Sequence, residues 1–182
     1  ELYAQIQQEL SQRARMQTVL QESEERFRTL SAAAPVGILQ TNADGICLYA
    51  NEAWQRMSGL SLENSLGNGW LQAIHPGDRA RVFAAWEAYL EQQREGQAEF
   101  RLLTPNRETR WISARVATIK SATNDIVGYV STYEDISERK RAEQALQDSE
   151  QRLQAILNYS PAVIYLIDAQ NRHLLANRSY AE

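Results

Sequence analysis

The sequence contains an internal repeat, which constrains the fold of this chain more than any other feature. Residues 10–56 align with residues 136–182 at a constant shift of 126 positions and without a gap. Two unrelated helices can share a charge pattern by chance, but chance would not carry one register through a proline and into an Ala-Asn pair. The sequence therefore predicts a tandem array of one structural unit. The identical pairs include Pro35 and Pro161, Ala50 and Ala176, and Asn51 and Asn177.

The repeat divides the chain into four expected segments. We expect an N-terminal linker helix over residues 1–23, a complete domain over 24–136, a second linker helix over 137–157 and the truncated start of a second domain over 158–182. Because the chain begins at Glu1 without a methionine, we expect it to be a piece of a longer protein. Two strands without the rest of their sheet are only marginally stable. The last segment should therefore be disordered, helical by extension, or paired with the sheet edge of another copy.

The two linker helices carry apolar residues at heptad-like spacing. In residues 2–30 the seam positions are mostly apolar, with polar interruptions at Glu9, Arg13 and Ser23, and residues 142–157 repeat the register. Such a seam favours a parallel homodimer through residues 2–30 and 142–157, and its polar positions make the coiled coil weak. The alternative is an amphipathic helix that lies on the domain's own core.

Between the linker helices the pattern changes to strands and short helices. Residues 37–51 predict a hairpin that turns at Asp44-Gly45. Glycines then break the chain into short helical turns. The order of two strands, helices and three strands indicates an α+β unit with an antiparallel sheet and helices on one face. The later strands are expected over residues 98–104, 109–120 and 126–133, and the glycines are Gly59, Gly67 and Gly69.

A longer helix is expected over residues 78–93. Asp78 is a plausible N-cap of this helix and Gly96 a plausible stop. Apolar residues recur along it at helical spacing, which predicts one buried stripe. The stripe residues are Val82, Phe83, Trp86, Tyr89 and Leu90.

Composition and motifs exclude several classes of function. A net charge of -4 offers no basic face for nucleic acid, and no apolar run reaches the roughly 20 residues that span a bilayer. The single cysteine, Cys47, excludes a disulfide framework and a thiolate zinc cluster. No phosphate-binding loop, metalloprotease motif or serine-hydrolase motif is present, so we expect a non-catalytic segment. An esterase-like site on His75 and Asp78 is the enzymatic alternative, and it lacks an evident nucleophile.

Several stretches resemble a PAS domain followed by its C-terminal PAC motif, as found in tandem in bacterial sensor proteins. The resemblance covers residues 22–147, and "EDISERKRAEQAL" is its most specific stretch. Two departures occur: Gly77 replaces the first acid of a His-Pro-Asp-Asp form, and Asn106-Arg107-Glu108 replaces the usual Asp-Gly turn. The other matching stretches are "ERFRTLSAAAPVGILQTNADGICLYANEAW", "WLQAIHPGDRARV", "AEFRLL", "RWISARVATI" and "GYVSTY".

The resemblance implies a PAS fold, with a five-stranded antiparallel sheet in the order 2-1-5-4-3, helices on one face and long coiled-coil-like helices on either side. It also implies that signals leave through the last strand into the following helix. Asp135 and Glu138 have capping-box spacing, and Ser137 could cap instead, so these three are the candidate relay residues. The implied parent is a sensor histidine kinase, or a diguanylate cyclase or phosphodiesterase. The implied partners are neighbouring PAS domains and an output domain.

The resemblance further implies a small-molecule pocket between the sheet and the helices. The simpler interpretation is that the aromatic residues there only fill the core. The stretch "GNGWLQ" has Trp70 where flavin-adduct photoreceptors have a cysteine, so no covalent flavin adduct is expected. His75 precedes Pro76 in a turn, where a histidine more often bonds nearby backbone than binds haem. The candidate pocket residues are Trp54, Met57, Trp70, Ile74, Phe83, Trp86, Phe100, Trp111 and Tyr129.

The leading functional hypothesis is therefore a sensory and signal-relay module of a multidomain receptor. It would be located in the cytoplasm, contact neither nucleic acid nor membrane, and bind a ligand that the sequence does not identify. The alternative is a ligand-free PAS domain that acts as a dimerisation scaffold. A haem- or flavin-binding sensor ranks third.

Overall fold

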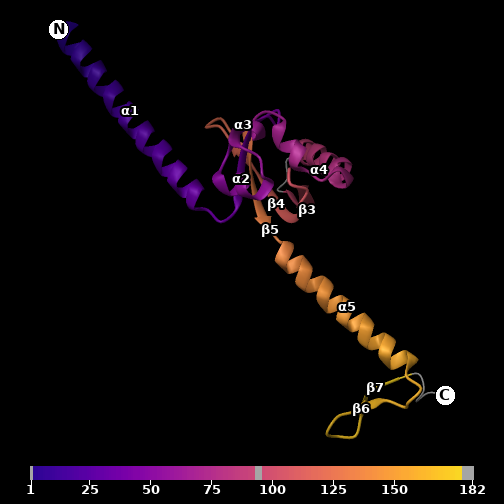
Figure 1. The fold of residues 1–182 in the computed structure, drawn as a ribbon. Coiled ribbons are helices and arrows are strands. Elements are labelled where there is room, and N and C mark those ends of the chain that lie inside the picture. The colour runs from indigo at the N-terminus through magenta and orange to yellow at the C-terminus, as the bar shows by residue number, and fades with distance from the viewer. Residues whose placement is uncertain (1, 93–95, 178–182) are drawn as a thin grey trace. The chain divides into compact units, whose positions relative to one another are not determined.

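The computed structural model of the chain describes residues 2–92 and 96–177. Two compact units make up the chain, Glu1–Ile136 and Ser137–Glu182. The first unit holds a long helix, a five-stranded sheet and several shorter helices, and the second holds a helix and a two-stranded hairpin (Figure 1). The expected helix end at residue 93 and the end of the repeat, residues 178–182, lie outside the described residues.

Helix α1 (Leu2–Ala33) opens the first unit and contacts the rest of it only near its C-terminal end. The ring of Phe27 lies 5.3 Å from that of Tyr49, and the Tyr49 hydroxyl donates a 2.9 Å hydrogen bond to the buried Ser31 hydroxyl. Side chains from Ile6 to Leu30 are all exposed. Apart from the contact between Phe27 and Tyr49, this part of α1 is therefore turned to solvent.

The sheet has the order β2-β1-β5-β4-β3, and all neighbouring strands are antiparallel. This confirms the strand order that the resemblance implied. The alternation of buried and half-buried residues along β1 shows that one face of the sheet is turned to the core. The strands are β1 (Gly37–Asn42), β2 (Cys47–Ala50), β3 (Gly96–Leu103), β4 (Thr109–Lys120) and β5 (Ile126–Asp135).

Four short helical segments follow the first hairpin, as the glycine pattern predicted. Asn51 caps the first of them through its side chain, and Gly59 ends it in the left-handed region with φ 73°. Contacts join α2 to β1, α3 to β2 and α4 to β3, so the helices lie over the inner face of the sheet (Figure 1). The segments are α2 (Glu52–Ser58), α3 (Leu62–Ser65), η1 (Gly69–Ala73) and η2 (Pro76–Asp78).

The longer helix, α4 (Arg79–Gln92), has close to the expected bounds over its described residues, but Asp78 and Gly96 do not have the roles that the sequence suggested. Asp78 belongs to the preceding 3-10 turn, and its carboxylate bonds to Arg101 on β3 instead of capping α4. Gly96 does not stop the helix, because it is the first residue of β3. A Cβ at Gly96 would lie 2.9 Å from Cδ2 of Tyr89, so the absence of a side chain lets α4 approach the sheet.

The second unit consists of α5 (Ser137–Tyr159), β6 (Tyr165–Ile167) and β7 (His173–Ala176). Its two strands pair antiparallel within the chain. The expectation of a disordered or helical segment was therefore wrong for the hairpin, and pairing with the sheet edge of another copy stays a prediction. Its apolar side chains are exposed, including Leu166 and Leu174.

Asn51 and Asn177 make the same hydrogen bonds in the two units. Oδ1 of Asn51 accepts the Ile38 N–H at 2.9 Å, and Nδ2 donates to the carbonyls of Ser31 and Val36. Each of these partners recurs 126 positions later around Asn177, on Ile164, Leu157 and Ala162. In both units the asparagine therefore ties the hairpin to the last turns of the preceding helix.

Candidate ligand cavity

An apolar cavity of about 90 Å³ lies between η1, α4 and the strands β3, β4 and β5. Trp70, Trp86 and Phe100 line it, and all three were candidate pocket residues from the sequence. Val82 and Tyr89 were expected on the buried stripe of the long helix, and the other lining residues were not expected, although the alternation along β4 could have indicated Ala114 and Val116. The remaining lining residues are Val82, Ala85, Tyr89, Gly96, Gln97, Ala98 and Tyr133.

Helix α4 presents its cavity wall through positions i, i+3, i+4 and i+7, which share one helical face. These positions hold Val82, Ala85, Trp86 and Tyr89. Phe83 lies about 100° away around the helix from Val82; it is 38% exposed and does not line the cavity. The structure therefore places Phe83 outside this cavity wall. The side chain of Leu90 lies outside the described residues.

Three other candidates fill the core without lining the cavity. Trp54 and Ile74 are fully buried, and Met57 is 6% exposed. The Trp54 indole N–H donates to the Ser65 hydroxyl at 3.1 Å, so its polar atom is satisfied inside the core. For these residues the simpler interpretation, core packing, is what the structure shows.

The last two candidates lie behind or away from the cavity. Tyr129 packs edge-on against Trp86 and Tyr89, with ring centroids 5.4 and 5.6 Å apart, and so supports the wall from behind. Trp111 alternates with the core residue Ile112 and therefore points to the other face of β4. There the Arg101 guanidinium lies 5.7 Å from the Trp111 ring centroid, within cation–π range.

Aromatic rings hold one another in place around the cavity. Trp86 and Tyr89 are stacked, with centroids 5.8 Å apart and planes 20° apart, and Trp70 meets Trp86 edge-on at 6.4 Å. On the sheet side, Tyr133 packs against Phe100 and Trp54. Burial of Tyr133 raises the pKa of its phenol well above the usual range, so the hydroxyl stays protonated.

An ion pair fastens the turn before α4 to β3. The buried Asp78 carboxylate accepts hydrogen bonds from Nε and Nη2 of Arg101 at 3.0 and 2.7 Å and from the Arg101 backbone N–H at 2.8 Å. These bonds from Arg101 lower the pKa of Asp78 to about 2, against a smaller opposing effect of burial. The pair therefore fixes the start of the cavity helix relative to the sheet.

His75 has the turn role expected from the sequence. Its Nδ1 accepts the Gly77 N–H at 3.1 Å, and its backbone N–H donates to the Arg101 carbonyl at 2.9 Å. Cys47 is buried in the core, as the sequence suggested, and burial raises the pKa of its thiol. Within residues 2–92 and 96–177, no three His, Cys, Asp or Glu side chains are grouped so that they could hold a metal ion.

The candidate relay residues lie where the sheet passes into the second helix. Asp135 ends β5, and Ser137 and Glu138 open α5. Between them, Ile136 is buried and its N–H donates to the Trp111 carbonyl at 2.9 Å. The last residue before α5 is thus anchored to β4.

A five-stranded antiparallel sheet in the order β2-β1-β5-β4-β3, with helices over one face, defines the class as an α+β domain. Residues 47–133 match the family model of the PAS fold. The chain therefore contains a PAS domain. Its fold is that of the sensory box histidine kinase/response regulator of Burkholderia thailandensis, with 29% identity, a TM-score of 0.55, and coverage of 71% of this chain and 98% of that one.

Two relatives show the setting in which similar segments occur. Protein y4lL of Sinorhizobium fredii is 30% identical over 150 residues, which cover 82% of this chain and 18% of the relative. The peroxide stress-activated histidine kinase mak1 of Schizosaccharomyces pombe is 31% identical over 150 residues, 78% of this chain and 9% of the kinase. The chain thus spans less than a fifth of either relative. No helix among the described residues is long and apolar enough to cross a membrane.

Proposed function

We propose that the chain is a sensory and signal-relay segment of a larger receptor, either a sensor histidine kinase or a diguanylate cyclase or phosphodiesterase. Similarity to histidine kinases supports the first class of parent. One observation carries the relay: Tyr133 of β5 lines the cavity and lies only four residues before Ser137, where α5 begins. A ligand that displaces Tyr133 would act on α5 through one short stretch of backbone.

The join between sheet and helix favours this route. Because Ile136 is buried and bonded to Trp111 on β4, a shift of the cavity strands changes the anchor of α5 as well. We propose that residues 126–147 form the PAC motif, in which Asp135 or Ser137 caps α5 and Glu138 completes the capping box. A capped helix start transmits a change of direction better than a frayed one.

We also propose the domain organisation that the repeat implies: linker helices at 1–23 and 137–157, a complete PAS domain at 24–136 and the start of a second one at 158–182. The matching bonds of Asn51 and Asn177 support the second domain. Exposed apolar residues along residues 2–30 and 142–157 support a parallel homodimer. Further PAS domains and an output domain would be the partners in the parent receptor.

The relay can be tested by filling the cavity and measuring the helix. Val116→Phe adds a ring inside the cavity, and Arg115→Phe adds the same ring on the opposite face of β4. We expect Val116→Phe to change amide hydrogen exchange over residues 137–147 severalfold, and Arg115→Phe to leave it as in the parent chain. Equal exchange in all three proteins would rule out the proposed route.

The second candidate function is a ligand-free dimerisation scaffold. The small cavity volume favours it, because drug-sized ligands occupy sites of roughly 300 Å³ or more. Native mass spectrometry of the protein purified from its source separates the two functions. A bound small molecule appears as added mass, whereas a scaffold shows the mass of the polypeptide alone.

A further inference from the structure

We propose that the cavity selects a small, uncharged, single-ring aromatic compound that carries one hydrogen-bond acceptor. This inference rests on the sensory function proposed above and adds the chemical class of its ligand. Four properties of the cavity carry it: the charge of its lining, its volume, the arrangement of its rings, and one unsatisfied donor in its wall.

The lining disfavours a charged ligand. Apart from Gln97, every lining residue is aromatic, aliphatic or glycine. The ion pair between Asp78 and Arg101 does not line the cavity and is already satisfied by its own hydrogen bonds. A buried carboxylate would find no counter-charge in this cavity, and an unpaired buried charge is strongly unfavourable. An ammonium could contact the ring faces, so the titration below includes one.

The volume limits the ligand to about one ring. At about 90 Å³ the cavity is smaller than an engineered apolar cavity of roughly 150 Å³ that binds benzene. Ala85 lines the cavity and is also exposed, so it marks the mouth where a ring would enter. A six-membered ring therefore fits only if part of it extends into this mouth.

The walls favour a planar aromatic ring over a saturated one. Trp86 and Tyr89 are held from behind by Tyr129, and Gly45 and Gly96 let their rings lie close to the backbone. Because these rings are already fixed, binding costs little ordering of side chains. Aromatic ligands gain edge-to-face or offset contacts with such rings, which a saturated ring of the same size does not make.

Trp70 supplies the reason for an acceptor. It lines the cavity, and its indole N–H is buried with no hydrogen-bond partner among the described residues. An unsatisfied buried donor is unfavourable, and an acceptor on a bound ligand would satisfy it once the Trp70 ring has turned its N–H toward the ligand. Trp54, by contrast, already donates to Ser65, so only one of these two buried indoles offers a free donor.

The test titrates the 182-residue chain with matched compounds and follows the indole N–H signals of its four tryptophans by NMR. Toluene and methylcyclohexane compare an aromatic with a saturated ring. Benzonitrile and phenylacetylene have the same shape but only the nitrile accepts a hydrogen bond. Benzoate and tetramethylammonium test the two charges. We expect toluene to bind about two- to tenfold more tightly than methylcyclohexane, and benzonitrile at least about threefold more tightly than phenylacetylene.

Two comparisons between variants test whether binding takes place in this cavity. Ala85→Leu should weaken toluene binding at least about tenfold by closing the mouth, and Ala84→Leu, on an exposed neighbouring position that does not line the cavity, should not. Trp70→Phe should remove the preference for benzonitrile over phenylacetylene, because it keeps a ring and deletes the donor. Retained toluene binding in Trp70→Phe shows that this variant still folds.

The outcomes distinguish a failure of the proposed ligand class from a failure of the proposed sensory function. Tighter binding of benzoate, tetramethylammonium or methylcyclohexane than of toluene overturns the ligand class. So does binding that Ala85→Leu and Ala84→Leu weaken equally, or a nitrile preference that survives in Trp70→Phe. If no compound binds and Val116→Phe still alters exchange in α5, the ligand class fails and the sensory function stands. If that response is absent as well, both fail.

Discussion

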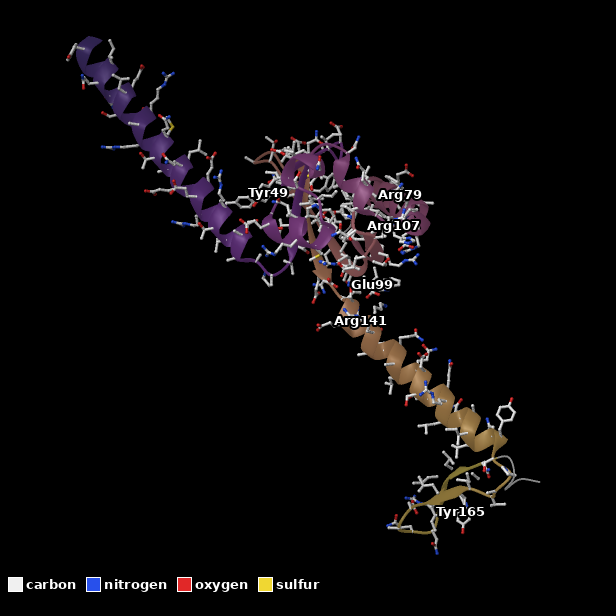
Figure 2. All side chains as sticks on the ribbon, viewed as in Figure 1. Tyr49, Arg79, Glu99, Arg107, Arg141 and Tyr165 are labelled. Carbon is white, nitrogen blue, oxygen red and sulfur yellow. The ribbon has the colours of Figure 1, made fainter. Side chains whose placement is uncertain are left out.

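Asp78 shows how a single residue can be misassigned by local pattern and yet be important. Its position before a helix suggests an N-cap, but the structure uses its carboxylate to bind Arg101 across to β3. A pairing 23 residues away cannot be deduced from local spacing. The sequence did predict that His75 bonds to backbone in this turn, and the structure shows its Nδ1 accepting the Gly77 N–H. Figure 2 labels Arg79, the first residue of the helix that this turn introduces.

The Asp78 pair predicts a pH-dependent stability. The pKa of Asp78 is lowered from its usual 3.8 to about 2 in the folded chain. Because the folded chain binds the Asp78 proton more weakly than the unfolded chain, the ionised carboxylate stabilises the fold at pH values above the unfolded pKa. This contribution is lost as the pH falls from about 4 to about 2. We expect the unfolding free energy to lose about 2 kcal/mol more between pH 5 and pH 2 than in Asp78→Asn. Urea unfolding followed by tryptophan fluorescence measures the difference, and identical pH dependences would refute the role of Asp78.

A second prediction at the residue scale concerns the effect of Asn51 on stability, with the equivalent residue of the repeat, Asn177, as control. Its buried side chain bonds Ile38, Trp54, Ser31 and Val36, so Asn51→Ala leaves several buried backbone groups unsatisfied. We expect a loss of about 2–4 kcal/mol in unfolding free energy of the first unit. Asn177→Ala should leave that value unchanged. All four tryptophans lie in the first unit, so their fluorescence reports it alone.

At the scale of elements, the sequence predicted the strands well, but it did not predict which side of an element some side chains turn to the core. The strand over residues 109–120 has the bounds of β4, because β-branched and aromatic residues bounded by turns identify a strand from local sequence. Which apolar neighbour faces inward is decided by packing. Val82 and Phe83 are both apolar, and the rotation of α4 about its own axis turns Val82, and not Phe83, toward the cavity. The strand order came from the family resemblance, since local pattern does not contain it.

The two hairpins predict a contrast in protection. The N–H of Ile38 and that of Ile164 each donate to an asparagine Oδ1 at 2.9 Å, yet only Ile38 belongs to a five-stranded sheet. Two strands alone are marginally stable. In a dilute sample, we therefore expect the Ile164 amide to exchange at least about 100-fold faster than the Ile38 amide. Comparable protection at both sites would show that the second hairpin is stable without the rest of a sheet.

At the scale of the whole molecule, the two long helices expose apolar residues along most of their described length. Figure 2 shows side chains projecting along α1 and along α5. Leu20 on α1 is 60% exposed, and Leu146 on α5 is 62% exposed. Single exposed apolar residues are ordinary, but a series at heptad spacing is typical of a helix that pairs with another.

The proposed homodimer gives the last prediction, in which neighbouring positions on α1 serve as test and control. Leu20 lies on the heptad seam, and Val19, which is 65% exposed, lies beside it off the seam. In a parallel dimer Leu20→Asp would bury a charge between the chains, whereas Val19→Asp would keep its charge in water. We therefore expect light scattering at micromolar concentration to give a dimer for the parent chain and Val19→Asp, and at least a tenfold higher dissociation constant for Leu20→Asp. Leu146→Asp should act like Leu20→Asp on the second seam. If the parent chain stays monomeric at high concentration, or if Val19→Asp and Leu20→Asp weaken association equally, the two chains do not pair through this seam.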